Sequence, residues 1–243
     1  MRVVDNKVTT VDHGAKAALF DSLAEVASAL GTGHRAEIID LLAQGERSVD
    51  EVATELEQSI ANASHHLRAL FRAGLVRSRR HGTRIYYRLA NSDVEDLWAA
   101  IKKVATSVRP ELESLAEQYL GSLDDLETIG RDELLERLER GEVQLLDVRP
   151  APEYQAGHIP GAQSVPLAEL TERIHELPNN MPVVAYCRGP YCAFAPAAVR
   201  VLLAAGLDAA RLQDGFPEWR RSGLPVEMED PPTAKAPSGP PAS

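Results

Sequence analysis

Both cysteines of the 243-residue chain lie in one six-residue stretch, Cys187 to Cys192, which directly follows an apolar run at 181–186. A short apolar run that follows turn residues predicts a buried strand. The Ala- and Leu-rich segment 193–205, which ends before Gly206, predicts a helix. A strand, a tight loop and a helix in this order are typical of an α/β sheet. The cysteines are therefore expected at the carboxyl end of a strand, where such sheets bind their ligands.

The position of Cys187 favours a reactive thiol, because amide groups at a helix N-terminus attract anions and lower the pKa of a nearby thiol. The two cysteines could instead form a disulfide, half of a metal site, or two buried small side chains. A tetrahedral metal site needs further ligands, and no Cys or His follows Cys192. A long chain with two cysteines and no export signal is an unusual disulfide scaffold. We therefore expect a thiolate nucleophile, with no metal and no cofactor.

A stripe of arginines interrupts a chain whose formal net charge is −10. Seven arginines and no acidic residue occur between positions 68 and 88, namely Arg68, Arg72, Arg77, Arg79, Arg80, Arg84 and Arg88. Such a stripe is a candidate phosphate-binding surface. A run of charge is by itself more often a solvated face, so its motif context decides.

That context is a helix-turn-helix with a hairpin. Apolar periodicity predicts helices at about 15–30, 33–43, 48–56 and 60–73. Ser48 and Glu51 match a capping box at the start of the third helix. The segment 75–89 alternates on both sides of a His-Gly pair, which predicts a basic β-hairpin.

In this arrangement the fourth helix would enter the major groove of DNA, and the hairpin would reach the backbone or the minor groove. The candidate contact residues are Ser59, Asn62, Ser64, His65 and Arg68 on the helix, and Arg79, Arg80 and Arg84 on the hairpin. His66 stands beside a core leucine and is expected to be structural.

The first half resembles the ArsR family of winged-helix repressors over about residues 15–105. The resemblance is carried by Gln58-Ser59, by Ser64-x-His66-Leu67-x-x-Leu70-x-x-Ala73-Gly74-Leu75-Val76, and by Arg79-x-x-Gly82-x-x-x-Tyr86-Tyr87-x-Leu89. It implies a homodimer that binds near-palindromic, double-stranded operator DNA and releases it when an effector binds. The metal ligands of sensing members are missing, because 45–50 has no cysteine and 93–119 has no histidine. Sensing through sulfur would therefore fall to the second half.

The helical pattern at 91–120 contains Pro110, which predicts one long helix that is kinked or broken there. With the first helix it would form the dimer interface. The turn-like segment 121–125 is the expected linker. The expected domains are a mainly α winged helix-turn-helix (α+β) for DNA binding and dimerisation at 1–120, an α/β domain with a parallel sheet at 126–228, and a disordered Pro-rich tail at 229–243.

The second half resembles the rhodanese domain over about residues 124–228. The resemblance is carried by Leu146-Asp147-Val148-Arg149-Pro150, by Glu153-Tyr154-x-x-Gly157-His158-Ile159-Pro160-Gly161-Ala162, by the cysteine loop and by Gly215-Phe216-Pro217-Glu218-Trp219. It implies an α/β rhodanese-like fold and a persulfide on Cys187, formed from small donors such as thiosulfate or persulfides. The charged residues Asp147, Arg149, Glu153 and His158 are expected to be structural.

Sulfur transfer needs a thiolate, N–H donors around the sulfane sulfur, and a cation for anionic donors. Cys187 fits the first role and the Arg188 side chain the third. The remaining loop residues, which form the expected cradle, are Gly189, Pro190, Tyr191 and Ala193. Cys192 takes a position where the family commonly has a polar residue or Arg, and it could resolve the persulfide to a disulfide or polysulfide bridge. The related Cys phosphatases have an Arg six positions after the Cys, where this chain has Ala193, which favours sulfur chemistry.

Three functions stay open at the level of sequence. The first is a DNA-binding repressor whose rhodanese domain senses or transfers sulfane sulfur, and the arginine stripe favours it. The second is a sulfurtransferase that uses its winged helix mainly to dimerise. The third is an arsenic- or metal-responsive regulator that uses Cys187 and Cys192. No apolar run is long enough to span a membrane and no leader pattern opens the chain, so a soluble, cytoplasmic protein is expected.

Overall fold

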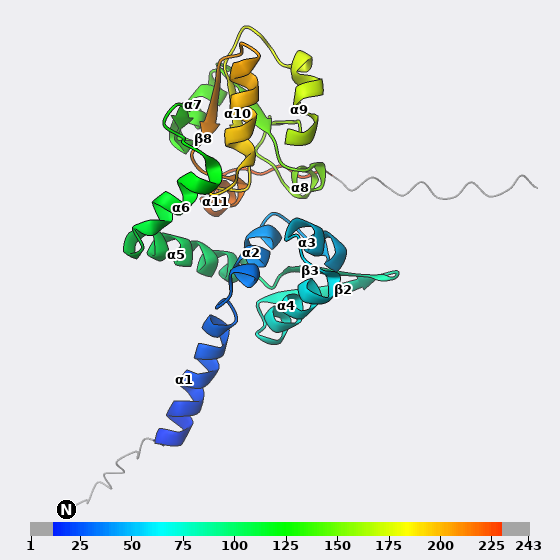
Figure 1. Ribbon diagram of the computed structural model, residues 1–243, viewed down its shortest axis with the longest axis vertical. Coiled ribbons are helices and arrows are strands. Elements are labelled where there is room, and N and C mark those ends of the chain that lie inside the picture. Colours follow the sequence, from blue (N-terminus) through cyan, green and yellow to red (C-terminus); the bar gives the residue numbers. More distant parts are fainter. Residues whose placement is uncertain (1–11, 230–243) are drawn as a thin grey trace, which may run out of the picture. The chain divides into compact units, whose positions relative to one another are not determined.

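The computed structural model describes residues 12–229, so the predicted tail at 229–243 lies outside the described residues except for its first position. The chain forms two compact units, Met1–Trp98 and Ala99–Ser243 (Figure 1). The division falls within helix α5 (Ser92–Val108), and the predicted linker at 121–125 lies inside the second unit. Between residues 12 and 229, no helix is long and apolar enough to cross a membrane.

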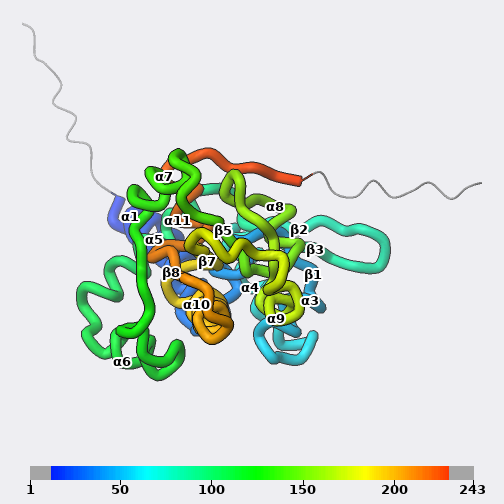
Figure 2. Tube along the Cα trace, turned by 90° about the horizontal axis from the view of Figure 1, so that it is seen from above, coloured from blue at the N-terminus to red at the C-terminus, as the bar shows by residue number. Residues whose placement is uncertain are grey.

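The first unit is a winged helix-turn-helix, which confirms the predicted fold. Its helices are α1 (His13–Ser28), α2 (Gly33–Leu42), α3 (Val49–Glu55) and α4 (Ile60–Arg72). Its strands are β1 (Arg47–Ser48), β2 (Val76–His81) and β3 (Arg84–Leu89), which form an antiparallel sheet in the order β1-β3-β2. The β2–β3 hairpin projects from this unit as the wing (Figure 2).

Local signals in the sequence fix the helix-turn-helix. Ser48 and Glu51 form the predicted capping box, in which Glu51 N donates to Ser48 Oγ at 3.3 Å and Ser48 N donates to Glu51 Oε2 at 2.6 Å. Ser59 caps α4 by accepting from Asn62 N at 3.2 Å. Behind these caps, the apolar faces of α2, α3 and α4 close one core around Ile38 and other fully buried side chains. Each such side chain contributes about 1.5–3 kcal/mol when it is buried completely.

Helix α1 has no buried residue, although it carries large apolar side chains. Leu19, Phe20 and Leu23 each remain about 60% exposed. Within the described part of the chain, Val26 near the end of the helix packs against the core, whereas these three side chains stay uncovered.

The predicted long helix at 91–120 is broken at Pro110, as expected. Helix α5 ends at Val108, and α6 (Glu111–Leu120) begins directly after the proline. A proline inside a helix removes one backbone hydrogen bond and clashes with the preceding turn, so the chain restarts there as a second helix.

The second unit is built on a parallel sheet in the order β4-β8-β7-β5-β6, which confirms the predicted α/β class. The strands are β4 (Thr128–Ile129), β5 (Gln144–Asp147), β6 (Gln163–Ser164), β7 (Val183–Tyr186) and β8 (Ala209–Leu212). The helices are α7 (Arg131–Glu139), α8 (Ala151–Ala156), α9 (Leu167–Arg173), α10 (Phe194–Ala204) and α11 (Phe216–Arg221), with a 3-10 turn at Ile174–Glu176.

Two helical layers cover this sheet. Helices α9 and α10 lie on one face, and α7 and α11 lie on the other (Figure 2). The central strand β7 is buried on both faces, as its uninterrupted apolar run predicts. The loop between β7 and α10 contains both cysteines, so the fold delivers them to the carboxyl edge of the sheet.

Candidate functional site

The cysteine loop starts where β7 ends. Cys187 follows the strand directly, its side chain is only 3% exposed, and its carbonyl accepts from Phe216 N at 3.0 Å. Cys192 is partly buried and directly precedes Ala193, the N-cap residue of α10, and both cysteines are free thiols. The loop therefore holds two unoxidised sulfurs between a strand end and a helix N-terminus.

The pKa values of the two thiols shift in opposite directions. Burial raises the pKa of Cys187, and the hydrogen bond to Cys192 with the charge on that sulfur raises it further. The same hydrogen bond lowers the pKa of Cys192 against the effect of its burial. Of the two thiols, Cys192 therefore ionises more readily than Cys187.

This direction differs from the sequence expectation, in which the helix N-terminus lowers the pKa of Cys187. Backbone N–H groups of Gly189 and Ala195 do lower it, but burial outweighs them. Cys192 receives its own donors from the backbone of Arg188 and Phe194. Backbone donors around the helix N-terminus therefore lower the pKa of both thiols. Cys187 is the more deeply buried, so it costs more free energy to ionise.

The Arg188 side chain is already engaged by a carboxylate. Its Nη2 lies 2.6 Å and its Nε 3.0 Å from Glu153 Oε1, and Glu153 is fully buried. The guanidinium also lies 5.0 Å above the Phe194 ring. Glu153, which the sequence assigned to structure, therefore sets the position of the proposed anion-binding cation and offsets its charge.

Backbone geometry shapes the expected cradle. Gly189 has a φ of +151°, which few other residues adopt, and its carbonyl accepts from Cys192 N at 3.1 Å. A Cβ on Gly215 would lie 2.2 Å from Gly189 N, so the β8–α11 turn sits directly against the loop. Pro190 has no N–H to donate. Ala193 is the N-cap residue of α10.

Asp147 and Arg149 form a buried ion pair, as predicted. Arg149 Nη2 lies 2.6 Å from Asp147 Oδ2 and donates to Gly157 O at 2.7 Å, and both side chains are fully buried. Burial alone would lower the pKa of Arg149, but the bond to Asp147 raises it. Tyr186 also donates to Asp147 Oδ2 at 2.6 Å, so β7 is tied to β5 directly behind the cysteine loop.

His158 has a structural environment, again as predicted. Its Nδ1 lies 2.9 Å from Tyr154 O, its ring stacks on Tyr154 at 3.7 Å, and Nε2 lies 3.6 Å from Glu227. These contacts hold the segment that precedes β6 and leave the imidazole outside the cysteine loop.

Arg211 is a cation near the thiols that no sequence motif predicts. Arg211 on β8 stands opposite Ala185 in the parallel register, two residues before Cys187 on the same face of the sheet. Burial lowers the pKa of Arg211, and the charge of Cys187 opposes that shift. Among residues 12–229 its Nε is buried with no hydrogen-bond partner. Only the pairing of β7 with β8 could have indicated this neighbour.

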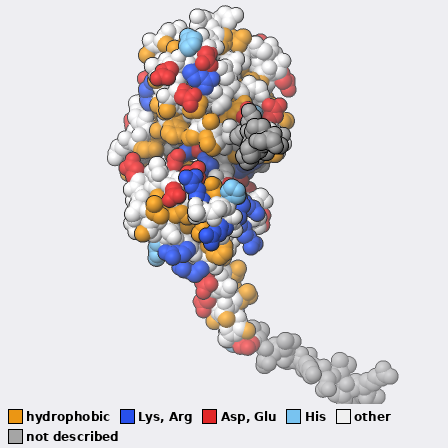
Figure 3. Space-filling view, turned by 90° about the vertical axis from the view of Figure 1, so that its right-hand side faces the viewer, with side chains coloured by type: hydrophobic (Ala, Val, Ile, Leu, Met, Phe, Trp, Pro, Cys, Tyr) orange, Lys and Arg blue, Asp and Glu red, His pale blue; other side chains and the backbone are white. Residues whose placement is uncertain are grey.

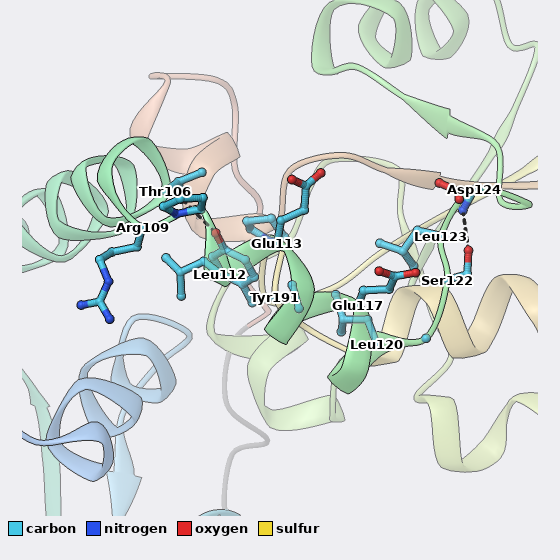
Figure 4. A pocket seen from close by; sticks show the side chains of 14 residues that line it. Thr106, Arg109, Leu112, Glu113, Glu117, Leu120, Ser122, Leu123, Asp124 and Tyr191 are labelled. Atoms are coloured by element: carbon cyan, nitrogen blue, oxygen red, sulfur yellow. Dashed lines mark hydrogen bonds between the residues drawn. The ribbon is translucent and has the colours of Figure 1, made fainter.

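A cavity of about 630 Å³ borders the loop (Figure 4). Its walls come from the end of α5, from α6, from residues 121–124 and from Pro190 and Tyr191. Thr106 and Tyr191 lie beside each other at its edge, and their hydroxyl oxygens are 2.9 Å apart. Tyr191 thus turns its ring toward α5, away from the sulfur cradle that the sequence assigned to it.

The structure places the predicted DNA-contact residues of α4 in different environments. Asn62, His65 and Arg68 are exposed, whereas Ser64 is half-buried. The Ser59 hydroxyl is occupied as the N-cap, and Asn62 Nδ2 donates to Gln58 Oε1 at 3.3 Å. The solvent-facing side of α4 therefore offers an amide, an imidazole and a guanidinium along one helix.

His66 lies on the inner side of α4. It is half-buried, its ring centroid is 5.4 Å from that of His34, and burial lowers its pKa. Its Nδ1 is buried without a hydrogen-bond partner between residues 12 and 229. The predicted structural hydrogen bond is thus not seen at this nitrogen.

The strand register sorts the wing arginines by face. Arg77 pairs with Arg88, Arg79 with Tyr86, and His81 with Arg84. Directly opposed residues share one face of a sheet, so Arg77, Arg79, Arg84 and Arg88 lie together. Arg80 pairs with Ile85 on the other face, and its Nε donates to Gly82 O at 3.1 Å.

Arg79 is fixed within this arginine face. Its Nε donates to Glu46 Oε2 at 2.8 Å, and its guanidinium lies 4.7 Å above the Tyr86 ring. The pKa of Arg79 is raised by the Glu46 hydrogen bond. Figure 3, which views the side toward which the wing points in Figure 1, shows Lys and Arg side chains gathered on this unit.

Between residues 12 and 229, no three His, Cys, Asp or Glu side chains converge as metal ligands.

Comparison with family models matches both halves of the chain. Residues 32–78 match the bacterial regulatory protein, arsR family, and residues 130–222 match the rhodanese-like domain. Both resemblances drawn from the sequence are thereby confirmed. The second match begins after α6 and contains neither α5 nor Thr106.

Relatives cover the chain at full length and in parts. The HTH-type transcriptional regulator Rv0324 of Mycobacterium tuberculosis is 51% identical over 212 residues, which are 87% of this chain and 93% of that protein. A sulfurtransferase of Allochromatium vinosum is 31% identical over 40% of this chain and 92% of its own length. A homodimeric winged helix-turn-helix DNA-binding domain from Mycobacterium bovis is 43% identical, with a TM-score of 0.37, over 45% of this chain and 94% of that one.

Proposed function

The chain belongs to the ArsR-family transcriptional regulators that carry a C-terminal rhodanese-like domain, and we propose that it is a DNA-binding repressor that senses or transfers sulfane sulfur through Cys187. One observation carries it: both thiols of the chain lie in the loop between β7 and α10, and the winged helix has none. Such a regulator would act in the cytoplasm, where the thiols stay reduced.

The proposed DNA contacts lie on α4 and on the wing. The exposed face of α4 has the polar side chains that read base edges, and the arginine face of β2–β3 has the charge that contacts phosphate. We assign residues 1–120 to DNA binding and dimerisation. The uncovered apolar side chains of α1, Leu19, Phe20 and Leu23, support a dimer because a second copy would bury them.

The proposed transfer of sulfur from thiosulfate takes place within residues 126–228 and needs no added oxidant. The Cys187 thiolate attacks the outer sulfur of thiosulfate, a Cys187 persulfide anion forms, and sulfite leaves with the electron pair of the broken S–S bond. Cys187 has to ionise for this attack, and burial and the charge on Cys192 both raise its pKa. Arg188 would bind the anionic donor from its position beside Glu153.

Cys192 gives the persulfide a second fate. Attack of the Cys192 thiolate on Sγ of the protonated Cys187 persulfide would form a Cys187–Cys192 disulfide and release hydrosulfide. The persulfide is then consumed with no outside acceptor, and the loop is left closed by a covalent bridge. A sensor gains a lasting signal from this step, whereas a turnover enzyme would be slowed by it.

A mobility-shift assay on DNA from upstream of the protein's own gene tests the proposal. The dimer should bind this DNA, and polysulfide or thiosulfate should change the affinity while arsenite does not. Binding that responds only to arsenite would support an arsenic-responsive regulator. Sulfur transfer with no DNA binding at any salt concentration would support a sulfurtransferase that uses the winged helix to dimerise.

A further inference from the structure

Helix α5 has contacts in both units. In the first unit, Trp98 Nε1 donates to Asp40 Oδ1 of α2 at 2.6 Å. In the second unit, Lys102 and Thr106, one helical turn apart, reach the surroundings of the cysteine loop. The helix is continuous from Ser92 to Val108, so side chains with these different partners lie on one helix.

Lys102 reaches the loop through Glu218. Lys102 Nζ lies 3.0 Å from Glu218 Oε1, and the two side chains are only 16% and 18% exposed. The other carboxylate oxygen, Glu218 Oε2, accepts from Gly215 N at 3.2 Å. A Cβ placed on Gly189 would come within 3.3 Å of the same oxygen, so the carboxylate lies against the loop backbone.

Gly215 completes this connection, because its backbone fills the space beside Arg188 and Gly189. The next residue, Phe216, donates its N–H to Cys187 O at 3.0 Å. A displaced Glu218 carboxylate would therefore release the turn that holds the carbonyl of the nucleophilic cysteine.

Thr106 reaches the loop through Tyr191, the residue before Cys192. The Thr106 hydroxyl donates to Lys102 O at 2.9 Å, which leaves an oxygen lone pair for the Tyr191 hydroxyl 2.9 Å away. Tyr191 is 40% exposed and borders the cavity of about 630 Å³. Open space on that side gives the ring room to move when the Thr106 bond is lost (Figure 4).

We propose that Lys102 and Thr106 are positioning residues for sulfur transfer at Cys187. They hold the two ends of the cysteine loop from a helix that lies outside the region matched by the rhodanese-like domain. The inference rests on the proposed sulfur chemistry and adds that this chemistry depends on α5.

The test uses the full chain with two readouts. One is kcat and KM for sulfur transfer from thiosulfate to cyanide, and the other is the rate of Cys187 alkylation by iodoacetamide. Thr106→Val should lower kcat by about 2- to 5-fold, and Lys102→Met by about 5- to 10-fold, with little change in KM. Alkylation should become faster in both variants, because loop opening exposes a thiol that is 3% exposed.

Matched variants separate positioning from general damage to the helix. Lys103→Met and Ser107→Ala change exposed neighbours on α5 and should behave like the parent. Thr106→Ser keeps the hydroxyl and should restore kcat. Tyr191→Phe combined with Thr106→Val should lower kcat no more than either single change, because both remove the same bond.

Failure of the proposed function and failure of the positioning role give different results. A parent protein that forms no Cys187 persulfide overturns the proposed function, whatever the alkylation rates are. Alkylation rates for Lys102→Met and Thr106→Val that equal those of Lys103→Met and Ser107→Ala overturn the positioning role. Additive losses in the Thr106 and Tyr191 cycle do so as well.

Discussion

At the scale of single residues, the sulfur chemistry depends on how readily each thiol ionises. Cys187 occupies the buried strand end, and Cys192 directly precedes the N-cap residue of α10. Burial raises the pKa of Cys187, while the hydrogen bond with Cys187, backbone donors and the charge of Arg188 lower the pKa of Cys192. Cys192 therefore ionises before Cys187, and we assign it the attack on the Cys187 persulfide.

The roles of the two cysteines predict different losses. Cys187→Ser should abolish persulfide formation, because serine cannot accept sulfane sulfur. Cys192→Ser should retain the first transfer and accumulate the persulfide, because the attacking thiol is gone. Mass spectrometry after treatment with thiosulfate measures both. A persulfide found on Cys192 alone in the parent would reverse the assignment.

The pH dependence of the first transfer should follow Cys187 and depend on the charge of Cys192. The pKa of Cys187 is raised by burial and then by Cys192, so its thiolate forms only as the pH rises beyond the ordinary thiol range. Cys192→Ser removes the charged neighbour and should shift the profile of persulfide formation toward lower pH. Initial rates from about pH 6 to about pH 10 bracket the ordinary thiol pKa. A profile that moves to higher pH in Cys192→Ser would contradict the effect of the Cys192 charge on the pKa of Cys187.

The buried ion pair behind the loop predicts a loss of stability. Arg149→Leu leaves the Asp147 carboxylate buried without its cation, which costs about 3–5 kcal/mol in comparable cases. Urea unfolding of the full chain, followed by the fluorescence of buried Trp219, reports the change. The control is Arg173→Leu, whose ion pairs are exposed and contribute about 0–1 kcal/mol. Equal losses in the two variants would count against the buried pair as a fold-stabilising feature.

At the scale of elements, the wing converts a run of arginines into two unequal faces. Register places Arg77, Arg79, Arg84 and Arg88 on one face and Arg80 on the other. Glu46 holds Arg79, which leaves the remaining three as the stronger candidates for phosphate contact on that face.

Removing two arginines from one face should therefore weaken binding to DNA of any sequence. Arg77→Ala with Arg84→Ala should lower the slope of log affinity against log salt by about 2, since each lost phosphate contact removes about 0.9. Arg80→Ala is the matched variant from the other face and should change the slope less. Fluorescence anisotropy across a salt series measures both. An Arg80→Ala effect as large as that of Arg84→Ala alone would show that the face assignment is wrong.

Some elements could be predicted from the sequence, and others could not. The capping box at Ser48, the break at Pro110 and the strand before Cys187 were predictable, because each is a local signal with a local cause. The two-residue strands β4 and β6 are too short to give a pattern. The direction of the Cys187 pKa shift and the neighbourhood of Arg211 depend on burial and strand order, which residue spacing does not encode.

At the scale of the whole molecule, the winged helix lacks the sensor ligands of its family, and both thiols lie in the second unit. The question is how a signal at these thiols could change the affinity for DNA. A signal alters DNA affinity only through the difference in free energy that it makes between two states of the protein. Helix α5 contributes side chains to both units. Its Trp98 bonds to α2 of the DNA-binding unit, and its Lys102 and Thr106 hold the cysteine loop.

We therefore expect sulfane sulfur to shift operator affinity through Cys187. Allosteric coupling free energies of about 1–3 kcal/mol would change the affinity by roughly 5- to 150-fold. Titration of upstream DNA with and without polysulfide should show this shift in the parent and none in Cys187→Ser. Thr106→Val should keep the persulfide but reduce the shift, because Tyr191 then moves without α5, whereas Ser107→Ala should match the parent. Superimposable titrations of the parent with and without polysulfide would mean that the rhodanese-like domain works independently of the repressor that carries it.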